Sequence, residues 1–231
     1  MERVVEPEWL DELPAEDHRA VSSREDLVRL NFLMGHAGIM ARLFQEAIGE
    51  RRGDHVVELG AGDGSFPQRW IRRLPKNLRP SRVTLVDRAG LVSSRTKAEF
   101  ADIGCEVDVR QADVFDWLAA SEPAEVISAN LFLHHFGEPE LGRLLNLVAM
   151  RCRCFIACEP RRSLTSLVGS KWLGLIDCND VTRHDAVVSV RAGFSGHELS
   201  RLWPKEARWV VRERKAGLFS HAFVAATCGR A

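Results

Sequence analysis

The chain has 231 residues, which is enough for one sizeable hydrophobic core, and the usual range of domain sizes favours one domain with appendages. Apolar residues make up 45% and charged residues 28%, which is typical of a folded globular chain and argues against a disordered or membrane-embedded one. Lys plus Arg equals Asp plus Glu at 32 each, so no overall positive charge exists to attract nucleic acid or an anionic bilayer.

The N-terminal sequence MERVVEPEWLDELPAED is acidic and lacks the basic and apolar regions of a secretory signal. No apolar run reaches the length of a membrane span, so the sequence predicts a cytoplasmic protein with no membrane insertion. The six cysteines are then expected to be reduced thiols. Cys152, Cys154 and Cys158 have metal-like spacing, but even spacing in an apolar strand predicts all three on one packed face. We therefore expect no metal site.

The predicted elements begin with a helical cap over residues 1–50, because apolar residues recur at helical spacing from Glu16 to about Gly49. Residues 55–60 (HVVELG) form a short apolar run that enters a glycine turn, which predicts a buried parallel strand. A helix over residues 65–74 follows. Residues 82–87 and 105–113 repeat the pattern as strands that end in an acid, separated by a helical stretch.

The second half of the chain continues this alternation. Residues 124–130 predict a fourth strand, 139–150 a helix and 152–160 a fifth strand stopped by Pro160. Such alternation predicts an α/β fold with a Rossmann-like, doubly wound sheet. Residues 161–203 interrupt it as a lid insertion, and residues 209–227 predict a terminal hairpin. We therefore expect one binding domain over residues 51–231 beneath the N-terminal cap.

Three glycines, Gly60, Gly62 and Gly64, lie where the first strand must turn sharply into a helix. Nicotinamide-binding loops have the spacing G-x-G-x-x-G and present backbone amides to a pyrophosphate, whereas this loop has G-x-G-x-G and follows Glu58. A carboxylate there repels a pyrophosphate and favours a positively charged ligand. The ammonium and sulfonium of S-adenosylmethionine (SAM) meet that requirement.

Two further acids occupy strand ends, where open α/β sheets bind ligands. Asp87 lies 23 positions after Gly64 and is placed to accept hydrogen bonds from a ribose diol. Asp113 is placed to accept from an adenine amine, with the backbone of Val114 completing that edge and either Arg88 or Leu131 covering the ring.

The segments ELGAGDG, LVD, QADVF and ANLFLHHF resemble the successive cofactor motifs of class I SAM-dependent methyltransferases. The terminal hairpin also resembles the one that closes the sheet in that family, which implies seven strands with one antiparallel. Loop glycines and strand-end acids also serve as turns and helix caps, so the structural role stays an alternative. The resemblance implies that the cofactor is bound by Glu58, Gly60, Ala61, Gly62, Gly64, Asp87, Arg88, Asp113, Val114 and Asn130.

Methyl transfer to a phenol or alcohol requires a group that removes the acceptor proton, and histidine suits that task at neutral pH. His134 and His135 follow the fourth strand and are candidate catalytic residues, with backbone bonding and packing as the alternative. His184 in the lid is a third candidate, and its alternative is a surface loop in which Asp185 caps a helix. Met34 to His36 are expected to line the pocket or to pack in the core.

Residues 159–194 resemble the lid of small-molecule methyltransferases from bacterial polyketide or phenolic-lipid pathways, which implies O-methylation of a hydroxylated aromatic or polyketide-like acceptor. The sequence after the fourth strand, Asn130-Leu131-Phe132-Leu133, lacks the N/D-P-P-F/Y tetrapeptide of enzymes that methylate amide or base nitrogens, which disfavours a nucleic-acid partner. Two alternatives are a SAM-binding regulatory or scaffold protein without catalysis and a nicotinamide oxidoreductase.

Overall fold

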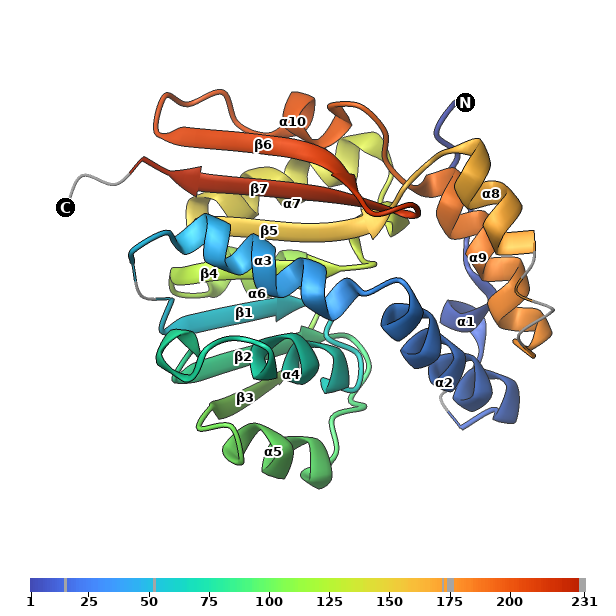
Figure 1. Cartoon of the computed structure of the whole chain (residues 1–231), viewed down its shortest axis with the longest axis horizontal. Coiled ribbons are helices and arrows are strands. Elements are labelled where there is room, and N and C mark those ends of the chain that lie inside the picture. Colours follow the sequence, from blue (N-terminus) through green and yellow to red (C-terminus); the bar gives the residue numbers. More distant parts are fainter. Residues whose placement is uncertain (15, 52, 172, 174–176, 229–231) are drawn as a thin grey trace.

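A seven-stranded sheet forms the centre of the computed structural model, which describes residues 1–14, 16–51, 53–171, 173 and 177–228 (Figure 1). The strand order is β3-β2-β1-β4-β5-β7-β6. The strands are β1 (His55–Leu59), β2 (Arg82–Asp87), β3 (Glu106–Gln111), β4 (Ala124–Asn130), β5 (Cys152–Pro160), β6 (Trp209–Ala216) and β7 (Ser220–Thr227). β1 to β5 pair in parallel, whereas β7 is antiparallel to β5 and to β6. The predicted seven-stranded sheet with an antiparallel terminal hairpin is thus confirmed.

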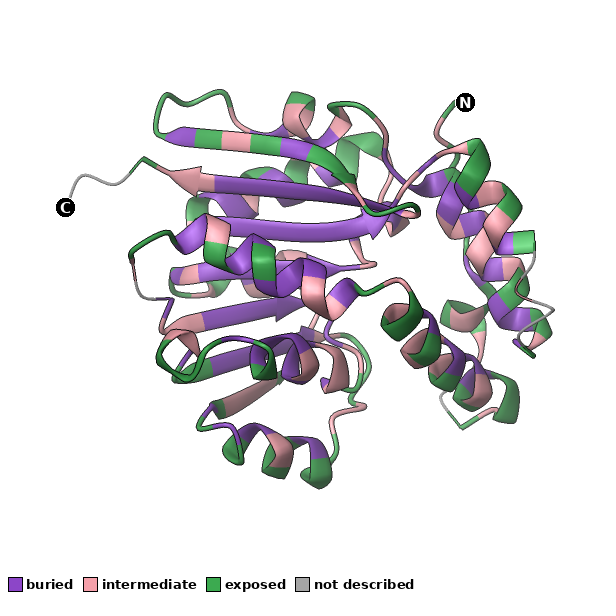
Figure 2. Cartoon of the chain, in the orientation of Figure 1, coloured by how far each residue is buried: buried purple, intermediate pink, exposed green. Residues whose placement is uncertain are grey.

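Helices cover both faces of the sheet, as expected for strands that are apolar on both sides. α3 (His36–Ile48), α4 (Ser65–Arg72) and α5 (Ser94–Ala101) pack on the front face, and α6 (Val114–Ala120), α7 (Glu138–Arg151) and α10 (Glu198–Leu202) pack behind it (Figure 1). Figure 2 shows that β1, β4, β5 and β7 are buried almost throughout, whereas the edge strands β3 and β6 are partly exposed. Two short 3-10 turns are η1 (Lys76–Leu78) and η2 (Leu133–His135).

A group of helices lies beyond the carboxyl ends of the parallel strands. It contains α1 (Trp9–Glu12), α2 (His18–Leu33), α8 (Leu164–Lys171) and α9 (Asp180–Ala192), which we call the cap (Figure 1). Side chains stop two of these helices from fraying: Asp17 accepts from the Arg19 amide before α2, and Asn179 accepts from the Thr182 amide before α9. The cap therefore joins the N-terminal segment to the predicted lid.

The segment predicted as one N-terminal cap divides at Gly35. This glycine has a φ of 68°, which turns the chain between α2 and α3. After the turn, Met40, Leu43 and Phe44 are fully or almost fully buried and belong to the front core, so α3 covers the sheet rather than its end. The predicted lid divides in the same way, because α10 packs against β6 and α7.

The cysteines are unpaired as predicted, but the three cysteines of β5 do not all lie on one face of the strand. All six cysteines are free thiols. Cys154 and Cys158 lie in the front core, but Cys152 lies in the rear core with α7. Cys152 directly follows the last residue of α7, so the regular alternation of the strand sets in only after it. Among the described residues, no helix combines the length and the apolar character that crossing a membrane requires.

Candidate active site

The glycine loop joins β1 to α4 at the carboxyl end of the sheet. The amides of Gly60 and Ala61 both donate to the carbonyl oxygen of Val86, at 2.9 and 3.2 Å, which ties the loop to β2. Gly60, Gly62 and Gly64 all have positive φ angles, of 67°, 55° and 75°, a conformation that side chains other than glycine rarely adopt. The sequence has glycines here because the backbone turn requires them.

The three glycines differ in what surrounds them. A Cβ on Gly60 would lie 2.3 Å from the ring of Phe132, and one on Gly64 would lie 2.8 Å from a methyl group of Leu85. Nothing lies within 4 Å of the corresponding position at Gly62. Gly60 and Gly64 are therefore required for internal packing, and Gly62 is the glycine that leaves open space for a ligand.

Asp87, the last residue of β2, holds the glycine loop in place. Its Oδ2 accepts a hydrogen bond from the Gly62 amide and its Oδ1 accepts one from the Ala89 amide, both at 2.8 Å. Each carboxylate oxygen has two lone pairs, so both oxygens retain capacity for a further donor. The arrangement combines the structural role with the capacity to bind a ribose diol.

Asp113 lies two residues beyond β3 and caps α6, with its Oδ1 accepting from the Phe115 amide at 2.8 Å. The predicted structural role is thus present, and the half-buried carboxylate still has lone pairs for a ligand amine. Val114 begins α6 and is buried, whereas the side chain of Arg88 is exposed beside the same strand ends. The two acids and the glycine loop follow three neighbouring strands.

Glu58 is far more buried than the sequence suggests, with an exposed fraction of 1%. It belongs to β1, and its carboxyl accepts a hydrogen bond from the hydroxyl of Ser128 on the adjacent strand β4. Burial raises the pKa of Glu58 to about 7, although the bond from Ser128 opposes this change. The carboxyl is therefore near half-ionised at neutral pH, which weakens the expected repulsion of a pyrophosphate and leaves a group that a nearby cation would ionise.

Asn130 ends β4 and is almost fully buried. Its Nδ2 donates to Oδ1 of Asn31 on α2 at 3.3 Å. His36 lies beside it, with Nε2 2.8 Å from the hydroxyl of Ser220 and its ring next to the Asn130 side chain. Burial lowers the pKa of His36 to about 4, so its ring is neutral. The Asn130 side chain thus links α2 of the cap to the sheet end and lies against the neutral ring of His36.

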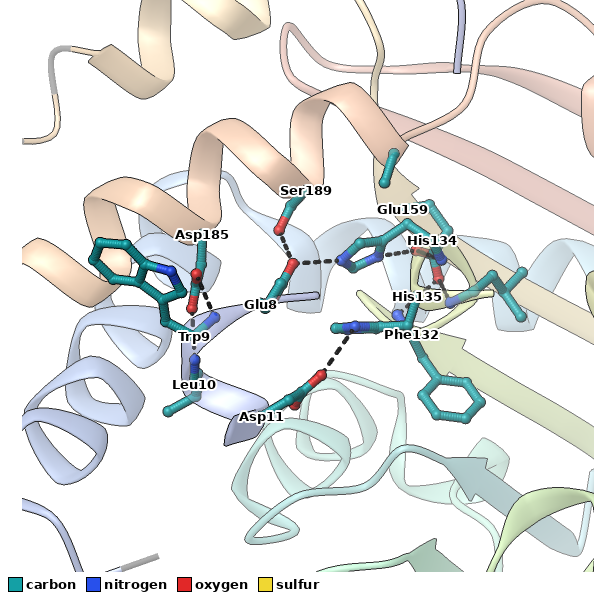
Figure 3. Close-up of polar contacts among 12 residues, drawn as sticks. Glu8, Trp9, Leu10, Asp11, Phe132, His134, His135, Glu159, Asp185 and Ser189 are labelled. Carbon is teal, nitrogen blue, oxygen red and sulfur yellow. Dashed lines mark hydrogen bonds and ion pairs between the residues drawn. The ribbon is translucent and has the colours of Figure 1, made fainter. Parts of the chain in front are cut away.

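The loop after β4 is fixed by Glu159, a fully buried residue of β5 (Figure 3). Its carboxylate accepts from the backbone amides of Phe132, Leu133 and His134, at 3.0, 2.9 and 3.4 Å. These bonds hold the loop directly after Leu131, a non-glycine residue with a φ of 53°. Strained backbone of this kind persists only where its surroundings enforce it, and it is common at functional sites.

His134 lies between two carboxylates. Its Nδ1 is 2.8 Å from Oε2 of Glu159 and its Nε2 is 3.3 Å from Oε1 of Glu8 (Figure 3). Burial alone lowers the pKa of His134, but the two carboxylates outweigh burial and raise it to about 9. Both ring nitrogens are occupied, which favours a positioning role for His134 over that of a base.

The other two candidate histidines have different surroundings. His135 has a partly exposed ring, with Nδ1 3.4 Å from Oδ2 of Asp11. His184 stacks on Trp9 with ring centroids 3.8 Å apart, and its Nδ1 is 2.9 Å from Oδ1 of Asp185. Asp185 in turn accepts from the Trp9 and Leu10 amides at the start of α1. The expected capping role of Asp185 is present, on a helix distant in sequence.

The comparisons with known proteins agree with this geometry. Residues 56–153 match the family model described as "Methyltransferase domain", which spans β1 to the start of β5 and includes the glycine loop, Asp87, Asp113 and Asn130. Residues 56–153 of this chain are thus similar to a methyltransferase domain. The search of curated proteins returned no match.

Several solved structures share the fold of this chain. An O-methyltransferase family protein from Burkholderia thailandensis has a TM-score of 0.63 at 18% identity over 94% of this chain. The plantazolicin methyltransferase BamL, solved with an analog and SAH, has a TM-score of 0.66 at 11% identity, with 94% of this chain and 92% of that chain covered. Magnesium protoporphyrin IX methyltransferase from Synechocystis PCC 6803, with bound SAH, has a TM-score of 0.52 at 12% identity, with 84% and 83% covered. This chain spans 62% of the Burkholderia protein.

The residues at the sheet end suit a nucleoside with a cationic side chain. Open space at Gly62 and spare lone pairs on Asp87 and Asp113 are the features that such a ligand requires. Glu58 adds a carboxyl whose ionisation a cation favours.

Two residues with central positions in the structure, Glu8 and Glu159, were not among the sequence candidates. Glu8 lies 126 positions before His134, and nothing in its acidic surroundings marks it as different from its neighbours. Glu159 follows an apolar strand, as Asp87 does, and that shared position at a strand end was a signal that could have found it.

Proposed function

We propose that this chain transfers a methyl group from SAM to a small-molecule acceptor, at the hydroxyl of an aromatic or polyketide-like compound. The observation that carries the proposal is the arrangement at three adjacent strand ends: the open glycine turn at Gly62, the Asp87 carboxylate bonded to that turn, and Asp113 at the start of α6. The family match over residues 56–153 supports it.

SAM supplies an electrophilic methyl group on a sulfonium. In the proposal, Asp87 accepts hydrogen bonds from the ribose hydroxyls, Asp113 accepts one from the adenine amine, and Asn130 contacts the cofactor from the end of β4. Glu58 supplies negative charge beneath the glycine loop. Because these groups are fixed by backbone bonds before the cofactor arrives, little order has to be gained on binding.

The acceptor class rests on the cap. Phe32 and Leu33 are 73% and 65% exposed and directly follow Asn31, whose side chain contacts Asn130. Large apolar side chains left exposed next to a cofactor site are suited to an aromatic acceptor. The likeness to an O-methyltransferase family protein supports oxygen as the methylated atom. A cytoplasmic location belongs to the same proposal and is supported by the six free thiols.

Of the three candidate histidines, we assign contact with the acceptor to His135. Its ring is partly exposed, whereas both nitrogens of His134 are occupied and His184 stacks on Trp9 at the outer part of the cap. His134 then orients the loop that carries His135.

Titration of the purified chain with SAM by calorimetry tests the cofactor. We expect measurable binding, and we expect Asp87→Ala to weaken it by about 1–3 kcal/mol, the scale of lost charge-assisted hydrogen bonds. Asp102→Ala, an exposed acid at the end of α5, is the matched control and should leave the affinity unchanged. Equal affinity for the wild type and Asp87→Ala would refute the ribose assignment. Binding of NAD or NADP in preference to SAM would identify an oxidoreductase instead.

Incubation with radiolabelled SAM and a panel of phenols, hydroxylated polyketides and fatty-acyl phenols tests the acceptor. We expect label in at least one hydroxylated aromatic compound and a loss of transfer in His135→Ala with SAM affinity retained. SAM binding without transfer to any member of the panel would favour the regulatory or scaffold alternative.

A further inference from the structure

We propose that Glu8, His134 and His135 form a binding site for one divalent transition-metal ion of the zinc type, at the junction of the N-terminal segment and the loop after β4. One ligand atom from each residue lies within 4.8 Å of the others. Two histidines and one carboxylate form a known zinc ligand set that leaves a coordination position open. The three side chains meet between α9 and the end of β5 (Figure 3).

The distances suit a metal ion. Two ligands of a tetrahedral zinc ion, each about 2.1 Å from it, are separated by about 3.4 Å. Oε1 of Glu8 and Nε2 of His134 are 3.3 Å apart, so these two atoms already have that separation. The ligand atom of His135 lies within 4.8 Å of the other two, so its ring has to move inward to complete the set. It is able to do so, because its side chain is partly exposed and belongs to a short 3-10 turn.

The surroundings of His134 are those of a metal ligand. Histidines that bind metal through one ring nitrogen almost always donate from the other nitrogen to a carboxylate or carbonyl, which fixes the ring orientation. Nδ1 of His134 lies 2.8 Å from Glu159, and Nε2 points to Glu8. Ser189 donates to the Glu8 carboxylate and thereby orients it, and the acceptor Oδ2 of Asp11 lies 3.4 Å from Nδ1 of His135. Each of the three candidate ligands thus has a further polar partner that orients it, as metal ligands do.

A second buried pair in the same chain shows what a purely structural arrangement looks like. Nε2 of His221 lies 2.8 Å from Glu213, which also accepts from the Leu199 and Ser200 amides, as Glu159 does from the loop after β4. Nδ1 of His221 meets no second histidine or carboxylate. Within the described part of the chain, the group at Glu8 is the one in which three metal-binding side chains converge.

The rings of His134 and His135 lie close together, with centroids 4.3 Å apart and a tilt of 34°. A protonated His134 between two carboxylates accounts for its own contacts, and the ion pair with Asp11 involves only Nδ1 of His135. A shared ion accounts in addition for the presence of one ligand atom from each of Glu8, His134 and His135 within 4.8 Å of the others.

The metal site extends the proposed function. Its role in catalysis rests on that proposed function. The loop with both histidines contains Phe132, whose ring packs against Gly60 of the cofactor loop. A metal ion here would hold the N-terminal segment against that loop, and its open position would bind the acceptor oxygen. His135 would then act on the acceptor through the ion rather than as a free base.

The test uses untagged full-length protein, freed of metal with a chelator and titrated with Co²⁺, which reports its coordination by its visible absorption. We expect one equivalent to bind with the spectrum of a four- or five-coordinate ion. His135→Asn and Glu8→Gln should each weaken binding by at least about tenfold. His197→Asn and Glu12→Gln, both exposed, are the matched controls and should bind as the wild type does. Circular dichroism verifies that each variant is folded.

Hydrogen exchange supplies a second measurement that does not depend on activity. Metal binding should slow exchange in residues 1–13 of the wild type and leave it unchanged in Glu8→Gln. Absence of a bound-cobalt spectrum, or a spectrum and affinity unaltered in both ligand variants, would overturn the metal site. If SAM binding and methyl transfer persist in that case, the proposed function stands and His135 acts as a metal-free base.

Discussion

Replacing Glu58 by glutamine is the most informative single change, because it separates stability from cofactor affinity. Glutamine has nearly the same shape and keeps an oxygen that accepts the hydrogen bond from Ser128, but it cannot ionise. The variant therefore removes only the titration of a carboxyl that is 1% exposed in the middle of the front core.

The magnitude follows from the pKa of Glu58, which burial raises from 4.5 to about 7. A carboxyl with a raised pKa is neutral in both states below pH 4.5, so it has no effect on stability there. As the pH rises from 4.5 to 7, the unfolded chain ionises first and the folded state loses stability. The full loss is about 3 kcal/mol, since each unit corresponds to about 1.4 kcal/mol.

Chemical denaturation of the two proteins at pH 5 and pH 8 measures this effect. We expect the stability of Glu58→Gln relative to the wild type to increase by about 2–3 kcal/mol between these two pH values. Every other titrating group is present in both proteins, so its contribution cancels when one free energy of unfolding is subtracted from the other. If the stabilities of the wild type and Glu58→Gln change with pH in the same way, the raised pKa of Glu58 is refuted.

The affinity for SAM should change in the opposite direction to the stability: the substitution that stabilises the folded protein should weaken SAM binding. A cation bound near Glu58 stabilises its carboxylate, so SAM binding near pH 6 should release up to about one proton in the wild type and none from residue 58 in Glu58→Gln. Calorimetry in two buffers with different ionisation enthalpies measures the proton count. The glutamine variant would thus be the more stable protein at pH 8 and the weaker binder of SAM, and higher affinity in the variant would contradict the electrostatic argument.

Two further changes test the packing around the site. Gly60→Ala places a methyl group against Phe132 in a left-handed backbone conformation and should lower the free energy of unfolding by about 3 kcal/mol, whereas Gly104→Ala, with a φ of 81° and open space around it, should cost only about 1 kcal/mol in denaturation experiments. Equal costs would show that the contact with Phe132 is unimportant. Asp185→Ala removes the acceptor of two amides at the start of α1 and should speed proteolysis of the N-terminal segment, whereas the exposed Asp180→Ala should not.

The sheet was predictable because each strand has a strong local signal. Residues 82–87 and 152–160 were assigned to strands with the bounds that the structure has, since short apolar runs ending in an acid or a proline have few other interpretations. The division of the N-terminal helices was not predicted. Helical periodicity shows that a helix has an apolar face but does not show which surface covers that face, and α2 packs against α9 whereas α3 packs against β5.

The cofactor side of the site was predicted better than the acceptor side for a related reason. Gly62, Asp87 and Asp113 follow strands whose order in the sheet is set by the fold, so their proximity follows from topology. Glu8 and His134 come together only through the packing of the N-terminal segment on α9, which has no periodic signal. The burial of Glu58 was also missed, because a sequence motif names a side chain without giving its depth.

The first residues of the chain reinforce the contact between α9 and the loop at η2. Arg3 donates to the carbonyl oxygens of Ala192 at the end of α9 and of Phe136 after η2, at 2.7 and 2.8 Å, and Arg162 donates to the carbonyl oxygen of Met1 at 2.9 Å. An affinity tag fused to Met1 would therefore add its bulk where the lid and the histidine loop meet. β7 ends on the side of the sheet opposite the cap (Figure 1), so a label attached at the end of β7 would leave acceptor entry undisturbed.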